Sequence, residues 1–186
     1  MKLTIEEKKT LLKIARAAIE ARVARKTLPK FDVETTSLKE NRGAFVTLHQ
    51  HGDLRGCIGY VEGIMPLAAT VKTVAAKAAM DDPRFPTVME SELESIEIEI
   101  SAMSPLEQIS SEREIEIGRD GLLIELGPRR GLLLPQVATE NDWDVLDFLS
   151  HTCIKAGLPI DAWKRPNAKI FRFSVELFSE KEFSNE

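Results

Sequence analysis

The chain has 186 residues, of which 43% are hydrophobic and 30% charged, and its formal net charge is −5. This is ordinary globular composition, which excludes intrinsic disorder, and a chain of this length buries a core without a disulfide or metal. The acidic balance disfavours nucleic acid and anionic membrane surfaces as partners.

Targeting and cofactor signals are lacking along the sequence. No run approaches the roughly 18 apolar residues of a membrane span, and the first nine residues lack the apolar stretch of a signal peptide. Cys57 and Cys153 stand far apart, no Cys/His set has zinc spacing, and no phosphate-binding glycine fingerprint is present. We therefore expect a cytoplasmic protein with free thiols and no metal, cofactor or membrane segment. The sequence leaves the oligomeric state open.

The chain opens with a predicted helix. Thr4 and Glu7 have the spacing of a capping box, and apolar residues then recur at three- and four-residue steps. We expect the helix to run from Thr4 to about Lys26, before Pro29. The polar residues 30–41 are expected to form a surface loop.

A hairpin and a second helix follow. Residues 43–50 and 54–60 read as antiparallel strands joined by a turn at His51-Gly52-Asp53. An alanine-rich helix is predicted over residues 67–80, with Pro66 at its first position.

Residues 81–86 contain two prolines three apart and predict a stiff, irregular loop. Residues 90–94 are expected to hold one helical turn. Residues 95–101 alternate isoleucine with polar residues, which predicts a strand with one dry and one polar face.

The middle of the chain predicts short hairpins. Residues 114–117 and 122–126 flank an Asp-Gly pair, which is a strong hairpin signal. Residues 128–131 read as a further turn, followed by a short strand over residues 132–134 that ends at Pro135.

A second long helix is predicted near the C-terminus, capped by Asn141 or Asp142 and ending at Gly157. The last strand spans residues 169–178. Hairpins dominate and regular βαβ alternation is absent, so we expect an α+β fold: a mainly antiparallel sheet with helices packed on one face. Residues 1–186 would form a single domain, with a larger lobe and a smaller lobe built around residues 105–135.

The stretch with the most chemical promise is Leu54–Tyr60. In a regular strand Leu54 and Ile58 would face the core, so Arg55 and Cys57 would share the opposite face, roughly 6.6 Å apart. An arginine at that range favours the thiolate form of a cysteine. This pattern predicts a soft nucleophile in positive surroundings.

Two glycines frame that cysteine. Gly56 and Gly59 would leave room for a ligand or a backbone to approach, and the helix that starts near Pro66 would offer N–H groups to an anion. Strand glycines also mark bulges, however, and free cysteine often packs as a small hydrophobe. The sequence therefore leaves Cys57 balanced between function and packing.

Other polar side chains are weaker candidates. Glu97 and Glu99 project from one strand face and Arg172 from another strand. They line a groove beside the motif, or they form the wet face of an antiparallel sheet, which is the simpler interpretation. His49 is a candidate base for the cysteine, although a lone histidine is more often structural.

Asp82 and Arg84 stand between a helix end and two prolines. They form either a salt-bridged helix stop, which we favour slightly, or a rigid rim beside a cleft. Cys153, Trp143 and Trp163 are expected in the packed interior.

Taken together, these motifs resemble the AMME-syndrome candidate protein (AMMECR) family. Its hallmark is a six-residue motif that reads here Leu54-Arg55-Gly56-Cys57-Ile58-Gly59. The resemblance covers nearly the whole chain, because further matching segments follow in the same order: Asp82-Pro83-Arg84-Phe85-Pro86, Ile96–Ser101, Gly118–Leu122, Gly131–Gln136 and Trp143–Gly157.

The resemblance implies an α+β protein with a larger and a smaller lobe, whose biochemical role is not established. It also implies that the hallmark forms a functional surface, carried here by Arg55, Gly56, Cys57 and Gly59. Some microbial relatives stand beside or are fused to a Memo-like protein and a radical-SAM protein, which implies a shared modification pathway.

Two functional hypotheses follow. In the first, the protein is a binding or accessory module whose motif face forms a groove for a protein partner or a small anionic ligand, with Arg55, Gly56, Gly59, Glu97, Arg84 and Arg172 as binding candidates. In the second, Cys57 is a nucleophile or redox thiol with Glu99 nearby. Whether the protein is an enzyme stays open, and the binding module is slightly ahead because a general base is missing.

Overall fold

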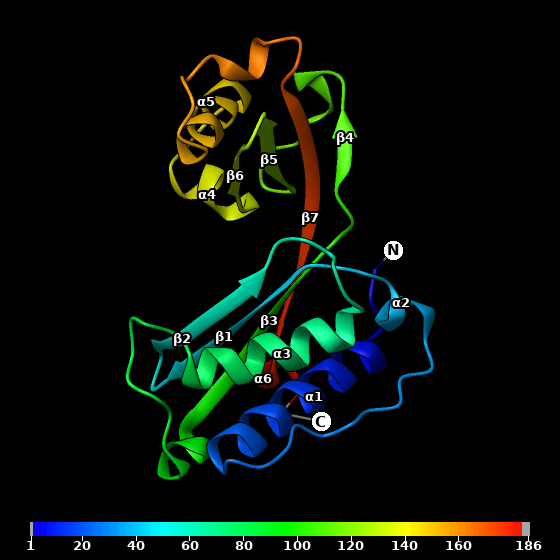
Figure 1. The fold of residues 1–186 in the computed structure, drawn as a ribbon, viewed down its shortest axis with the longest axis vertical. Coiled ribbons are helices and arrows are strands. Elements are labelled where there is room, and N and C mark those ends of the chain that lie inside the picture. The colour runs from blue at the N-terminus through cyan, green and yellow to red at the C-terminus, as the bar shows by residue number, and fades with distance from the viewer. Residues whose placement is uncertain (1, 184–186) are drawn as a thin grey trace. The chain divides into compact units, whose positions relative to one another are not determined.

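The computed structural model describes residues 2–183 and divides into two compact units. Unit 1 comprises the chain up to Met103 together with the residues from Glu176 onward, and unit 2 comprises Ser104–Val175. Both units combine helices with antiparallel strands (Figure 1), which confirms the predicted α+β class. No helix in the described part of the chain is long and apolar enough to cross a membrane.

Unit 1 is a sheet with the strand order β2-β1-β3-β7, in which β1 pairs antiparallel with β2 and β3. Its elements in chain order are α1 (Ile5–Val23), α2 (Thr36–Lys39), β1 (Ala44–Gln50), β2 (Asp53–Tyr60), α3 (Leu67–Met80), the 3-10 helix η1 (Glu90–Ser95), β3 (Ile96–Met103), the end of β7 (Lys169–Ser179) and α6 (Glu180–Phe183).

The first helix begins as predicted and ends early. The Thr4 hydroxyl accepts the Glu7 N–H at 3.2 Å and the Glu7 carboxylate accepts the Thr4 N–H at 2.8 Å, so the capping box is present. The helix ends at Val23, well before Pro29, because Arg25 adopts a left-handed conformation with φ 55°.

The helices α1 and α3 lie along one face of the unit 1 sheet (Figure 1). Side chains alternate along each strand, so one set packs under the helices and the other points away. The buried set includes Val46 and Leu48 of β1, Ile98 and Ile100 of β3 and Phe178 of β7. The opposite face therefore carries the intervening residues of each strand, and we call it the helix-free face.

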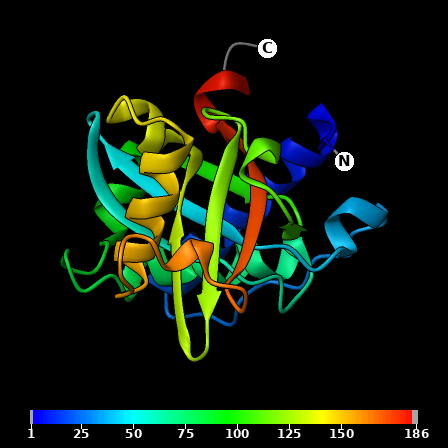
Figure 2. The ribbon, with the colours of Figure 1, turned by 90° about the horizontal axis from the view of Figure 1, so that it is seen from above.

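Unit 2 has the strand order β6-β5-β7-β4, and α5 packs against β5 and β6 (Figure 2). Its elements are β4 (Glu107–Ile109), the 3-10 helix η2 (Glu112–Glu114), β5 (Asp120–Leu126), β6 (Arg129–Leu133), α4 (Pro135–Glu140), α5 (Val145–Lys155), the 3-10 helix η3 (Ala162–Lys164) and the first part of β7.

The hairpin predicted around the Asp-Gly pair is wrong. Asp120 and Gly121 begin strand β5, and the turn that joins β5 to β6 lies at Gly127-Pro128. The buried Asp120 carboxylate accepts the Glu116 N–H at 2.9 Å and is held by Arg119, so it closes the preceding turn. Gly121 lies opposite Phe173, and a Cβ there would come within 2.3 Å of that ring. Gly121 is therefore required by packing against the Phe173 ring and not by the geometry of a turn.

Two further predictions need correction. The predicted loop 30–41 contains the short helix α2. The strand predicted to end at Pro135 does end before it, and Pro135 then begins α4, because a helix tolerates proline in its first turn, where the missing N–H costs no hydrogen bond. The helix α5 is capped by Asp144, whose carboxylate accepts the Leu146 and Asp147 N–H groups, and Asp142 is in a left-handed conformation outside the helix.

Candidate functional site

The Leu54–Gly59 motif lies on β2, the edge strand of the unit 1 sheet. The β1–β2 turn is tight, since His51 and Gly52 both have positive φ. A β-bulge follows: His49 pairs with Leu54 but Leu48 pairs with Gly56, which leaves Arg55 as the extra residue. The bulge reverses the alternation at the start of the motif, so Leu54 points away from the core and is 42% exposed.

Arg55 does not share a face with Cys57, contrary to the prediction from strand alternation. Its guanidinium binds the Glu92 carboxylate of η1 through two hydrogen bonds, of 2.8 and 3.1 Å. It also donates to the carbonyl oxygens of Pro86 and Thr87. The Arg55 guanidinium lowers the pKa of Glu92, so the two charges neutralise each other. Arg55 thus anchors the loop after α3 to the bulge.

Neither glycine of the motif opens space for a ligand, which corrects that expectation. A Cβ on Gly56 would lie 2.3 Å from the Ala78 carbonyl oxygen of α3. A Cβ on Gly59 would lie 2.1 Å from the ring of Phe45, its partner on β1. Gly56 allows helix and sheet to approach closely, and Gly59 receives an aromatic ring from the neighbouring strand.

The loop after α3 covers the exposed edge of β2 at Cys57. The Asp82 carboxylate accepts the Cys57 N–H at 2.8 Å, and the Arg84 guanidinium donates to the Cys57 carbonyl oxygen at 3.1 Å. The same guanidinium binds Asp82 at 2.7 Å. This hydrogen-bonded ion pair holds the pKa of the Asp82 carboxyl well below its ordinary value. The two side chains occupy the backbone positions that a further strand would use.

Cys57 lies on the helix-free face in a row of three residues across three strands. Its partner on β1 is Thr47, which in turn pairs with Glu99 on β3. The Thr47 hydroxyl donates to the Cys57 Sγ at 3.3 Å. His49, the candidate base, has its Nε2 3.9 Å from Glu99 Oε1, so its imidazole lies toward the carboxylate of the same face.

The other candidates from the sequence, Glu97 and Arg172, do not belong to the row formed by Cys57, Thr47 and Glu99. Glu97 pairs with His49 in the next row of the helix-free face. Arg172 belongs to unit 2, where it binds the Glu107 carboxylate at 3.0 Å. The start of α3 is occupied, because the Leu67 N–H donates to the Glu40 carbonyl oxygen and Pro66 is the N-cap.

Comparison with known proteins assigns this architecture to a family. A family model described as AMMECR1 matches residues 12–178. The chain belongs to the AMMECR1 family. A relative in Methanothermobacter thermautotrophicus is 45% identical over 185 residues and covers 96% of both chains, and one in Methanocaldococcus jannaschii is 46% identical over 190 residues and covers 97% of this chain and 93% of the relative.

A solved structure supports the same assignment. The crystal structure of an uncharacterized protein from Pyrococcus horikoshii has a TM-score of 0.82 and 39% sequence identity, and it covers 97% of this chain and 95% of that chain. The family predicted from the motifs is therefore confirmed.

In this AMMECR1 protein the charged groups around the motif are bound within the chain. Arg55 is paired with Glu92, and Arg84 with Asp82. Among residues 2–183, no three His, Cys, Asp or Glu side chains are grouped so that they could hold a metal ion. On the helix-free face the motif presents the Cys57 thiol and the exposed Leu54, beside the Thr47 hydroxyl of β1 and the Glu99 carboxylate of β3.

Two residues of the AMMECR1 site, Thr47 and Glu92, were not identified from the sequence. Counting from the His51-Gly52 turn without a bulge places Cys57 opposite Val46, whereas the bulge shifts its partner to Thr47. Glu92 lies 37 residues from Arg55 along the chain, and no local pattern links them. The glycine at position 56 within a predicted strand was the available sequence signal for a bulge.

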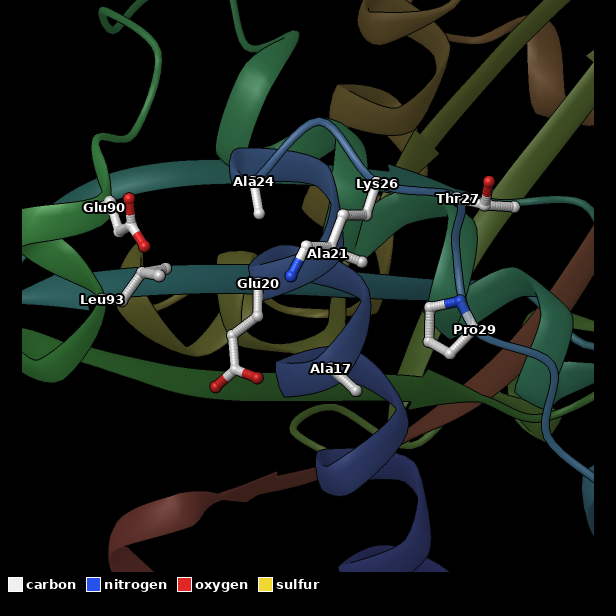
Figure 3. A pocket seen from close by; sticks show the side chains of 9 residues that line it. All are labelled: Ala17, Glu20, Ala21, Ala24, Lys26, Thr27, Pro29, Glu90 and Leu93. Carbon is white, nitrogen blue, oxygen red and sulfur yellow. The ribbon is translucent and has the colours of Figure 1, made fainter.

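Unit 1 also has a hollow of about 470 Å³ along the last turns of α1 (Figure 3). The 3-10 helix η1, which holds Arg55 through Glu92, forms one wall, and the loop after α1 forms another. The 3-10 helix η1 therefore both contacts the AMMECR1 motif and lines this hollow. The lining residues are Ala17, Glu20, Ala21, Ala24, Lys26, Thr27, Pro29, Glu90 and Leu93.

Proposed function

We propose that this AMMECR1 protein is a binding or accessory module that docks a protein partner on the helix-free face of unit 1, with the Leu54–Gly59 motif as its outer strand. One observation carries the proposal: two large apolar side chains are exposed on this face. Leu54 is 42% exposed, and Leu177, which alternates with the buried Phe178, is 56% exposed. Exposed leucines beside polar residues are typical of protein-docking surfaces.

The charge of the face defines the partner. Glu97 and Glu99 of β3 are half-buried carboxylates on it, so a complementary surface combines apolar side chains with lysine or arginine. A small anionic ligand, the other expectation from the sequence, is less well supported, because Arg55 is already paired with Glu92 and the ligand would meet these carboxylates.

The face is held rigid by contacts outside it. Asp82 and Arg84 bind the backbone of Cys57, and Glu92 of η1 binds Arg55, so the motif strand is attached at two positions to the segment after α3. A rigid strand loses little conformational entropy on docking, which favours affinity. These charged side chains act as supports for the docking surface and do not contact the partner.

The family resemblance adds candidate partners. It implies a modification pathway shared with a Memo-like protein and a radical-SAM protein, and we propose that one of them binds the helix-free face.

The test is a binding measurement with these two proteins from the same organism. Isothermal titration calorimetry would compare the wild type with Leu54→Asp and Leu177→Asp, and with Ile154→Asp as a control on an exposed residue of unit 2. We expect the affinity of one partner to fall at least about tenfold in both face variants and to stay unchanged in the control. Binding of neither partner, or equal loss in all three variants, would contradict the proposal.

The alternative function is an enzyme that uses Cys57 as nucleophile or redox thiol. The observation in its favour is the hydrogen bond from the Thr47 hydroxyl to the sulfur, because donation to a thiolate stabilises it. Glu99 lies in the same row and would be the nearby carboxylate. The alkylation rate of Cys57 against pH, in a Cys153→Ser background, tests this. A midpoint near the ordinary value of about 8.5 would contradict an activated thiol.

A further inference from the structure

Unit 2 contains a hollow of about 480 Å³ that no function described above uses. The residues after β4, including Ser110, form one wall. The segment from η3 to the start of β7, including Trp163, Lys164 and Arg165, forms the other. The volume is in the range of roughly 300–1,000 Å³ that holds small molecules in proteins.

Two cations of this hollow have no carboxylate partner. Among residues 2–183, neither Lys164 nor Arg165 takes part in an ion pair, whereas Arg119 and Arg172 of the same unit bind Asp120 and Glu107. Unpaired cations at the wall of a concave site are suited to bind an anion through charge-assisted hydrogen bonds.

An aromatic ring, the indole of Trp163, also lines the hollow. The half-buried Trp163 packs against both hydrophobic clusters of unit 2, so its indole is fixed in position. The Lys164 Nζ lies 5.1 Å from the centre of this ring, which places the cation above the aromatic face. A cation and an indole face thus lie together at one wall.

The segment that carries these groups is ordered by its own backbone. The Arg165 N–H donates to the Ala162 carbonyl oxygen at 3.1 Å, and the Ala168 N–H donates to the Arg165 carbonyl oxygen at 3.0 Å. The cations are therefore presented from a preformed turn, which reduces the entropy lost when a ligand binds. Glu112 lies on the other wall of the hollow, with the residues after β4, so the anionic group of a ligand must lie toward Lys164 and Arg165, and a hydroxyl or amino group of the ligand would donate to Glu112.

We propose that this hollow binds a small organic anion that carries a phosphate or carboxylate group on a planar ring. Lys164 and Arg165 bind the anionic group, and the Trp163 indole packs against the ring. This site lies within unit 2 and does not depend on the docking surface proposed for unit 1.

The experiment is a titration of the full chain with two probes, adenosine 5′-monophosphate and salicylate, which separate a phosphate from a carboxylate ligand. Adenosine, which has the ring without the anion, is the comparison compound. Calorimetry measures affinity, and the indole N–H signal of Trp163 in a ¹H–¹⁵N NMR spectrum locates binding. Arg165→Ala and Lys164→Ala remove the cations, and Arg113→Ala is the control, an exposed arginine of unit 2 that does not line the hollow.

We expect one anionic probe to bind with a dissociation constant below about 1 mM and to shift the Trp163 signal. Each cation variant should weaken this binding by about tenfold or more while the control and the unfolding midpoint stay unchanged. The proposal is overturned if neither probe gives a saturable shift at Trp163, if adenosine binds equally well, or if Arg165→Ala and Arg113→Ala bind alike.

Discussion

Asp82 and Cys57 are joined through the backbone of the motif strand: the Asp82 carboxylate accepts the Cys57 N–H at 2.8 Å. Arg84, bound to the same carboxylate, donates to the Cys57 carbonyl oxygen at 3.1 Å. The edge of β2 is thereby satisfied by two side chains of a loop instead of by another strand. The Leu54–Gly59 motif and the loop that carries Asp82 and Arg84 are separate in the sequence, but these hydrogen bonds join them in the structure.

Removing the Asp82 carboxylate should destabilise unit 1. The Asp82 side chain is only 2% exposed, and Asp82→Ala leaves the Cys57 N–H and the half-exposed Arg84 without their partner. We expect the free energy of unfolding to fall by about 2–4 kcal/mol, measured by urea denaturation. Asp81→Ala is the matched control: Asp81 is exposed and 3.5 Å from Arg22, so its loss should change stability by less than about 1 kcal/mol. Equal effects would contradict this role of Asp82.

Stability should fall in acid because of Asp82 and Glu92. Hydrogen bonding to Arg84 lowers the pKa of Asp82 in the folded state, and Arg55 does the same for Glu92. The unfolded chain then binds protons more readily, with pKa values of about 4, so the stabilisation is present above pH 4 and is lost as pH falls below it. Urea midpoints measured between neutral pH and about pH 3 should show this loss. In Asp82→Asn the urea midpoint should fall less between neutral pH and about pH 3 than it does in the wild type. An equal fall in both proteins would refute this role of Asp82.

Gly56 should be more sensitive to substitution than Gly59. In Gly56→Ala the new Cβ meets a backbone carbonyl of α3 at 2.3 Å, which cannot move without shifting the helix. In Gly59→Ala it meets the Phe45 ring, a side chain that can rotate away. We expect Gly56→Ala to lower the free energy of unfolding by about 2–3 kcal/mol, and Gly59→Ala by less. Thermal and urea unfolding of both variants checks this, and the reverse order would contradict the packing described for α3.

Much of the fold follows from local patterns in the sequence. The capping box at Thr4, the alternation of isoleucines in β3 and the alanine-rich helix α3 are each encoded within a few residues. The turn predicted at residues 128–131 lies close to the observed β5–β6 turn. The hairpin predicted around Asp120-Gly121 is wrong because tertiary packing overrides the local signal: a ring from β7 covers the glycine.

The geometry of the motif could not be predicted in the same way. A single bulge residue, Arg55, reverses the faces of the residues before it, and nothing in a period-two pattern shows where a bulge occurs. The partners Glu92 and Asp82 come from a distant loop, so their contacts depend on the tertiary fold. The row formed by Cys57, Thr47 and Glu99 follows only once the register is known.

The Arg55–Glu92 ion pair should act as a loop anchor. Both side chains are largely buried, and the guanidinium also binds two carbonyl oxygens, so Arg55→Ala should cost about 2 kcal/mol of stability. A double-mutant cycle of Arg55→Ala and Glu92→Ala should give a coupling energy of about 1 kcal/mol or more. Additive effects would show that the pair does not stabilise the loop.

The central claim, that the helix-free face docks a partner, is tested most directly by protection of Cys57. The thiol is half-exposed on that face, and Cys153 is buried in unit 2, so an alkylating reagent under native conditions reports on Cys57. We predict that a saturating amount of the Memo-like or radical-SAM partner slows alkylation of Cys57 at least about tenfold, because docking removes the thiol from solvent. An unchanged rate in the presence of a bound partner would contradict the account.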